Sequence, residues 1–424
     1  MKMFFELIQI SLGNKDRFER LPTKEEWPVL FDLACKQSIE SVLLEGVNRL
    51  ENLNANVNAN PNLNANVNAN PNVNVNPNLN LNVNLDLNPD DDLNLDLNLQ
   101  LEWIGAGLQT ENMNKVQNER AKELTELFAK NGFRSCVLKG QGTALYYDKP
   151  ERRQCGDIDI WVTEDEVFRV HGEGVKDIER AKRQSRVQGS ADDVRCEVLR
   201  FVKEKGFHIG HVDIKHSDIK FFEDVPVEVH FLPSWMYCPA TNKRLQKFFQ
   251  EKKERQFANI DEELGFAHTT IDFDLVYSMV HIYRHIFSEG IGLRQLVDYY
   301  YILQHSTEEQ RKDAFNVLCQ LKMKSFAGGI IWILSECFGM NIKYSLCPAN
   351  EKHGSFLLSE IMTAGSFGHF DDRIKQIDHN KKFKRGFSQL KRNLRFVTYY
   401  PSEVLWSPFW KLWHWGWRKR KGYL

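Results

Sequence analysis

Residues 137–163 read VLKGQGTALYYDKPERRQCGDIDIWVT, which is an apolar strand, a glycine turn, the start of a helix and a strictly alternating second strand. Side chains two residues apart in a strand project from the same face, so Asp157 and Asp159 stand side by side while Ile158 and Ile160 face the core. Neighbouring carboxylates disfavour each other's ionisation unless a cation compensates them, and Mg²⁺ prefers oxygen ligands. The spacing therefore predicts a metal site on one strand, although a solvated strand face would show the same pair.

A third acid, Glu228, lies in the alternating stretch Pro226-Val-Glu-Val-His-Phe. If this strand neighbours the first, three carboxylates converge, and such a set can hold two metal ions that activate an attacking oxygen and a leaving pyrophosphate. Only Glu228 has apolar neighbours on both sides and an alternating His230 after it. The acids that compete for the role are Glu204, Asp213, Asp218, Glu223 and Asp224.

The glycine turn that precedes the acids predicts a phosphate-binding segment. Free backbone N–H groups at a helix N-terminus bind phosphate. Gly140 and Gly142 allow the backbone to approach a ligand closely, and Lys139 adds positive charge.

These motifs together resemble a known family. The run LKGQGTALYY, the turn with Arg152 and Arg153, then GDIDIWV and VEVHF resemble the polymerase-β-type nucleotidyltransferase superfamily. The closer resemblance is to an uncharacterised bacterial nucleotidyltransferase family typified by Bacteroidetes proteins. The stretches HIYRHIFSEGIGLRQLVDYY and YPSEVLWSPFWKLWHW also resemble that family, so the likeness covers most of the chain outside residues 52–100.

The resemblance implies an enzyme that moves a nucleoside monophosphate from an NTP, with ATP as the expected donor, and releases pyrophosphate. Asp157, Asp159 and Glu228 would be the catalytic residues and the metal ligands, with Mg²⁺ or alternatively Mn²⁺ as cofactor. The acceptor stays open between a small molecule, a protein and an RNA. The residues expected at the nucleotide are Lys139, Gly140, Gln141, Gly142, Thr143 and Arg153, with Thr143 in place of the superfamily's usual serine. The alternative is a non-catalytic nucleotide-sensing or interaction protein on the same scaffold.

The expected fold class is α+β, with a small mixed-sheet nucleotidyltransferase domain flanked by N-terminal helices and a larger C-terminal helical region. Helical periodicity covers 1–50 and 101–130, with a helix expected over 108–131. Strands alternate with short helices over 131–240, and residues 164–205 are expected to be helical, with a loop at the polar patch 183–193 as the alternative for that part. From 241 to 424 the pattern is helical, with helices expected over 241–256, 272–288, 291–304, 308–322 and 326–338.

Residues 51–100 form an Asn-rich low-complexity insertion. Every even position from 52 to 100 is Asn, Asp or Gln, and residues 52–61 are repeated identically at 62–71. Four prolines interrupt the alternation, and Asn disfavours strands. We expect a disordered or loosely extended surface segment, with a small repetitive β-layer as the alternative, and order resuming at Leu101.

The composition excludes several classes of protein. There are 56 Lys and Arg against 57 Asp and Glu, so a polyanion binder that works by bulk positive charge is excluded. Eight scattered cysteines without a CxxC give neither a disulfide framework nor a zinc ribbon, which favours a reducing cytoplasmic compartment. The N-terminus does not have the pattern of a signal peptide. The sequence contains no run of eighteen apolar residues, so we expect no integral membrane association. The oligomeric state stays open.

Several other polar residues carry weaker expectations. His281, His285 and Glu289 share a helical face that we expect to close over the nucleotide site or pack inside the helical region. Arg294 and Asp298 are spaced as an ion pair on a helix surface, and the family resemblance implies, as the alternative, a role near the active site. The histidines of the strand region are expected to be ordinary surface or edge residues: His208, His211 and His216. The tail after residue 404 holds five tryptophans and a basic end, and packing on the helices is favoured over a membrane or nucleic-acid contact.

Overall fold

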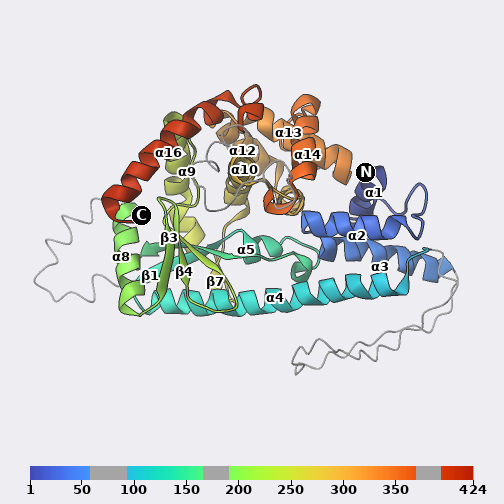
Figure 1. Cartoon of the computed structure of the whole chain (residues 1–424), viewed down its shortest axis with the longest axis horizontal. Coiled ribbons are helices and arrows are strands. Elements are labelled where there is room, and N and C mark those ends of the chain that lie inside the picture. The colour runs from blue at the N-terminus through green and yellow to red at the C-terminus, as the bar shows by residue number, and fades with distance from the viewer. Residues whose placement is uncertain (58–92, 166–190, 369–392, 424) are drawn as a thin grey trace, which may run out of the picture.

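The computed structural model describes residues 1–57, 93–165, 191–368 and 393–423. Four helices make up the N-terminal part, and the longest, α4, runs along one side of the molecule beneath the sheet and the other N-terminal helices (Figure 1). Within the described ranges, every helix is too short or too polar to span a bilayer. The N-terminal helices are α1 (Lys2–Ser11), α2 (Glu26–Gln37), α3 (Glu40–Val57) and α4 (Leu97–Ala129).

Both ends of the Asn-rich segment are helical. Helix α3 continues to Val57, and α4 begins at Leu97, so the expectation that order resumes at Leu101 was wrong. Asp96 explains the earlier start, because its Oδ1 accepts from the backbone N–H groups of Asn98 at 2.9 Å and Leu99 at 3.4 Å. Such a cap satisfies donors that have no partner within the helix. The predicted extended structure of residues 58–92 lies outside the described residues.

The sheet has five strands in the order β1-β2-β5-β4-β3. Strands β2 and β5 are parallel and adjacent, and every other neighbouring pair is antiparallel. The strands are β1 (Phe133–Leu138), β2 (Ile158–Glu164), β3 (His208–Val212), β4 (His216–Lys220) and β5 (Val227–His230). The short elements between them are α5 (Gly140–Ala144), the 3₁₀ turn η1 (Pro150–Arg152) and α8 (Ala191–Glu204).

Alternation along β2 separates two cores. Ile158, Ile160 and Val162 pack with residues of α4 and α8 in one buried cluster, as the sequence predicted for the two isoleucines. Trp161 points to the opposite face, where its ring lies 4.9 Å from that of Phe257 and 6.2 Å from that of Phe273. Asp159 shares this second face, so the acid faces the C-terminal helices. Residues 166–190 of the expected helical stretch 164–205 lie outside the described residues.

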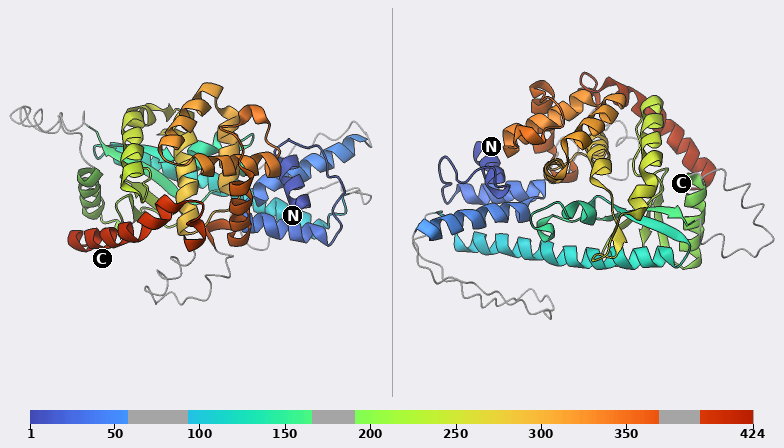
Figure 2. Two further views of the ribbon diagram at one scale, coloured as in Figure 1. Left: turned by 90° about the horizontal axis from the view of Figure 1, so that it is seen from above. Right: turned by 180° about the vertical axis from the view of Figure 1, so that it is seen from behind.

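The C-terminal part is helical, as predicted, apart from the two-stranded β6 (Ile260–Asp261) and β7 (Phe266–Ala267). Its helices lie over the sheet on the side away from α4 (Figures 1 and 2). The α-helices are α9 (Pro239–Ala258), α10 (Ile271–Ser288), α11 (Arg294–His305), α12 (Glu308–Gln320), α13 (Lys324–Phe338), α14 (Glu351–Ala364) and α16 (Pro401–Lys421). Three 3₁₀ turns accompany them: η2 (Ile342–Tyr344), η3 (Ser366–Gly368) and η4 (Leu394–Phe396). The α+β class is confirmed, whereas the domain boundaries near 130 and 240 stay predictions.

Candidate active site

Three carboxylates converge where β2 and β5 lie side by side. Asp159 is in register with Glu228, and Asp157 stands directly before β2. One carboxylate oxygen from each of the three lies within 4.8 Å of the others. The convergence that the sequence made conditional on strand order is therefore present, and Glu228 completes the set rather than any of the five competing acids.

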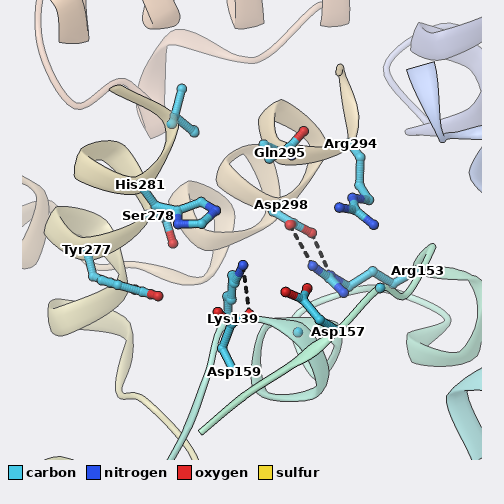
Figure 3. Close-up of a pocket in the computed structure, with 13 residues that line it drawn as sticks. Lys139, Arg153, Asp157, Asp159, Tyr277, Ser278, His281, Arg294, Gln295 and Asp298 are labelled. Atoms are coloured by element: carbon cyan, nitrogen blue, oxygen red, sulfur yellow. Dashed lines mark hydrogen bonds and ion pairs between the residues drawn. The ribbon is translucent and has the colours of Figure 1, made fainter. Parts of the chain in front are cut away.

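Lys139 supplies positive charge to this acidic cluster. It follows β1 with a φ of +47°, and its Nζ lies 2.7 Å from Oδ2 of Asp159 (Figure 3). Burial alone would lower the pKa of Lys139, but the charges of the three carboxylates outweigh it and raise the pKa. The lysine is therefore a charged counter-ion for the acids.

The two aspartates are shifted in opposite directions. Burial and the charge of Asp159 raise the pKa of Asp157. Burial also opposes ionisation of Asp159, but Lys139 and a hydrogen bond from His230 outweigh it and lower the pKa. Three carboxylate groups thus gather in one place. This cluster of hard oxygen donors fits a divalent cation such as Mg²⁺ or Mn²⁺.

His230 ties the second and third acids together. Its Nε2 lies 2.8 Å from Oδ1 of Asp159 and 3.3 Å from Oε2 of Glu228, while Nδ1 lies 3.3 Å from the carbonyl oxygen of Leu232. Both ring nitrogens therefore face acceptors, which only a doubly protonated ring can satisfy. Burial and Lys215 oppose that charge, but the two carboxylates outweigh them and raise the pKa of His230.

The expectation for His216 was wrong. Strand β4 pairs with β5 so that His216 lies opposite His230, and the ring centroids are 5.4 Å apart. Its Nδ1 lies 3.6 Å from Oε2 of Glu228, and Lys215 Nζ lies 3.8 Å from the same oxygen. The approach of Lys215 and His216 to Glu228 was missed because the pairing of β4 with β5 is not readable from either strand alone. Both residues help to lower the pKa of Glu228, against the opposing effect of burial.

Helices α10 and α11 form the opposite wall of the cavity over the acids. Figure 3 shows His281, Tyr277 and Ser278 of α10 facing Lys139 and the aspartates. Of the face expected to close over the nucleotide site or pack inside the helical region, His281 lines this cavity, whereas His285 and Glu289 are not among its lining residues. Tyr277 and Ser278 were missed, although Tyr277 precedes His281 by one helical turn and so shares its face. The residues lining the cavity are Lys139, Gly140, Arg153, Gly156, Asp157, Asp159, Tyr277, Ser278, His281, Ile282, Arg294, Gln295 and Asp298.

Arg153 reaches the cavity as one half of a buried ion pair. Its Nε and Nη2 lie 2.8 and 2.9 Å from the two carboxylate oxygens of Asp298 on α11. The hydroxyl of Tyr147 donates to the same carboxylate at 2.6 Å. The surface reading of Arg294 and Asp298 is wrong, because both side chains are buried, and both line the cavity over the acids. Nη1 of Arg294 donates to the carbonyl oxygens of Gln154 and Cys155, both at 3.3 Å.

Four residues in or after the predicted phosphate-binding segment are not among those that line the cavity: Gln141, Gly142, Thr143 and Arg152. The amide of Gln141 donates to Oδ1 of Asn114 at 3.2 Å and of Asn118 at 2.8 Å, so it binds α4. A Cβ added at Gly142 would meet Cβ of His268 at 2.8 Å, which explains this glycine by packing. Thr143 is buried outside the cavity lining. Arg152 pairs with Glu45 and Glu111 of the N-terminal helices.

Comparison with known proteins gives one match. A family model described as an uncharacterised nucleotidyltransferase matches residues 23–173 and 190–339, more than half of the chain. No curated protein and no solved structure matches the chain. The tail at 400–415 lies beyond the matched residues, so its resemblance to the family is not part of this match. On the extent of the match, the chain belongs to this family of uncharacterised nucleotidyltransferases.

Proposed function

We propose that this protein is a divalent-metal-dependent nucleotidyltransferase of the polymerase-β-type superfamily, of bacterial and Bacteroidetes type. It transfers a nucleoside monophosphate from an NTP, with ATP as the expected donor, to a hydroxyl or phosphate acceptor. The observation that carries the proposal is the convergence of Asp157, Asp159 and Glu228 on two adjacent parallel strands. The expected compartment is the cytoplasm, and the acceptor is a small molecule, a protein or an RNA.

The bonds exchanged in this reaction follow from the chemistry of an NTP. An acceptor oxygen attacks the α-phosphorus, and an oxygen–phosphorus bond forms there. The bond from the α-phosphorus to the bridging oxygen breaks, and that oxygen keeps the electron pair and leaves as pyrophosphate. A bound Mg²⁺ or Mn²⁺ ion, held by the three carboxylates, would neutralise charge on the phosphate oxygens.

We assign the acceptor's proton to Glu228. Its side chain is 28% exposed, against 2% for Asp159, so an acceptor can reach it from solvent. Its lowered pKa keeps the carboxylate ionised, so it can accept a hydrogen bond from the acceptor hydroxyl and pass the proton on to solvent instead of retaining it. His230 bonds to both acids and thereby fixes their separation. In this assignment Lys139 and Arg153 lie on the side of the triphosphate, where positive charge favours the leaving pyrophosphate.

Transfer of α-labelled NTP tests the proposal. Each of the four NTPs is incubated with Mg²⁺ or Mn²⁺ and nucleotide-depleted cell extract, using the wild type and Asp157→Asn/Asp159→Asn. We expect label on an acceptor with the wild type only. A matched control is Asp32→Asn/Asp313→Asn, which removes two exposed carboxylates away from the cavity and should keep full transfer.

The outcomes separate the proposal from its alternative. Equal labelling by the wild type and the Asp157/Asp159 variant would refute the assignment of the acids. Nucleotide binding by calorimetry without transfer in any extract would favour the non-catalytic nucleotide-sensing protein. Absence of both binding and transfer would overturn both functions.

A further inference from the structure

Helix α16 differs from an ordinary surface helix, because its buried face is mixed: Glu403 and Ser407 are buried there together with Val404 and Trp417. The buried carboxylate of Glu403 accepts from the backbone N–H groups of Tyr237 at 2.8 Å and Cys238 at 3.2 Å. Ser407 is buried one turn later, and the ring of His414 stacks between those of Trp410 and Trp417. A surface helix normally turns its apolar stripe inward and its polar face to water.

The outward face of α16 is apolar and aromatic. Its spacing at i, i+4 and i+7 from Leu405 places the exposed side chains in one stripe. Among the described residues, four other large hydrophobic side chains are exposed along α4, each at 45% or less, and the remaining six stand singly on different parts of the chain. The exposed fractions in the stripe are Leu405 59%, Trp406 44%, Phe409 68%, Leu412 69%, Trp413 51% and Trp415 54%.

A run of four basic residues, 418–421, follows the stripe at the end of the same helix. Lys419 and Arg420 are exposed, and Nζ of Lys419 lies 5.4 Å from the centroid of the Trp415 ring. The only acid in α16 is Glu403, which is buried at the other end. The exposed surface of the helix is therefore apolar along its length and cationic at its C-terminal end.

The helix lies on the rim of the molecule, where a flat surface can reach it. Helix α16 runs along the outer edge of the molecule in the views of Figures 1 and 2, and Figure 1 shows it passing α9 toward α8. Because α16 is not apolar enough to span a bilayer, it would lie in the plane of one.

We propose that α16 binds the surface of an anionic phospholipid bilayer, with the apolar stripe at the boundary between headgroups and acyl chains. Tryptophan is favoured at that depth, and the basic run complements anionic headgroups. A single-stranded nucleic acid would instead favour cations interleaved with the aromatic rings along its path. The proposal goes beyond the transferase function and does not depend on it.

The attachment of α16 would also orient the candidate active site. Glu403 bonds to the segment that follows β5, and its Oε2 lies 3.7 Å from Nη1 of Arg284 on α10, the helix that carries His281. A bilayer bound by α16 would therefore hold the cavity in a fixed direction relative to the lipid surface.

Vesicle flotation with the full chain tests the proposal. Vesicles of phosphatidylcholine alone are compared with vesicles that contain about one third phosphatidylglycerol. We expect the wild type to float with the anionic vesicles, and Phe409→Ser/Leu412→Ser to bind at least about tenfold more weakly. Lys419→Gln/Arg420→Gln should weaken binding to anionic vesicles by about fivefold per residue, and raised salt should act in the same direction.

A matched control is Ile260→Ser/Ile342→Ser, which removes two exposed isoleucines outside α16. It should float like the wild type, and circular dichroism should show that every variant is folded. Failure of the wild type to bind anionic vesicles would overturn the proposal, as would equal binding by Phe409→Ser/Leu412→Ser. A wild-type dimer that becomes monomeric in that variant, without vesicle binding, would show that the face joins two copies of the chain.

Discussion

Asp157 and Asp159 are two residues apart, yet burial and neighbours move their pKa values in opposite directions. Asp159 has Lys139 and His230 beside it, whereas Asp157 is mainly desolvated and repelled. Although both aspartates project from the same face of the strand, their surroundings give their carboxyl groups different pKa values. A bound cation would remove most of this difference, because it compensates both acids at once.

The buried carboxyl group of Asp274 makes the stability of the folded protein depend on pH. Burial raises the pKa of Asp274 on α10 to about 7, although the Tyr146 hydroxyl donates to it. Between the unfolded value near 3.9 and about 7, the unfolded chain loses this proton and the folded chain keeps it. The contribution of Asp274 to stability is therefore complete at low pH, falls as pH rises through this window and levels off above about 7.

Asp274→Asn should reduce the loss of stability between about pH 5 and about pH 8 by up to about 3 kcal/mol. Urea unfolding at a series of pH values measures this. Asp272→Asn is a comparison on the same helix: hydrogen bonding and ion pairing lower the pKa of Asp272 despite burial, so its own contribution is constant between about pH 5 and about pH 8 and is lost only at lower pH. Because the charge of Asp272 is one of the smaller causes that raise the pKa of Asp274, Asp272→Asn should have a smaller effect than Asp274→Asn. An Asp274 variant with the wild-type pH profile would contradict the prediction.

At the level of whole elements, α16 is held by few but buried contacts. Glu403→Ala would leave the N–H groups of Tyr237 and Cys238 buried without their acceptor, which costs about 1–3 kcal/mol. We expect faster hydrogen exchange over 401–421 and lower stability. Glu403→Gln keeps one acceptor oxygen and should show a smaller effect. Unchanged exchange in the alanine variant would mean that other contacts hold the helix.

The cavity joins parts of the chain that are far apart in sequence. Asp157 and Asp159 line it at the start of β2, and its opposite wall comes from α10 and α11. The Arg153–Asp298 pair crosses between the two sides. A ligand bound here contacts both parts, so it should stabilise the molecule as one unit.

Thermal unfolding tests this coupling. ATP with Mn²⁺ at about 100 times its Kd should stabilise the wild type by about 2.7 kcal/mol, seen as a higher melting temperature. Asp157→Asn/Asp159→Asn should lose the ligand-dependent rise. Its melting temperature without ligand serves as its own baseline, because Asp157→Asn relieves repulsion whereas Asp159→Asn removes the partner of Lys139 and His230. EDTA should abolish the rise in the wild type. A rise of equal size in the double variant would place the ligand elsewhere.

Local spacing was enough to predict the paired aspartates, the isoleucine core face and the C-terminal helices, because strand and helix periods are properties of a few consecutive residues. Glu228 could be proposed from its own strand, but its approach to Asp159 required β5 to lie beside β2. The same strand order brought in His216, and the packing of α10 and α11 brought in Tyr277 and Arg294. Gln141 and Gly142 followed the phosphate pattern, yet contacts with α4 and His268 explain them. Tertiary structure decided these positions because they depend on contacts between distant segments, which no local pattern encodes.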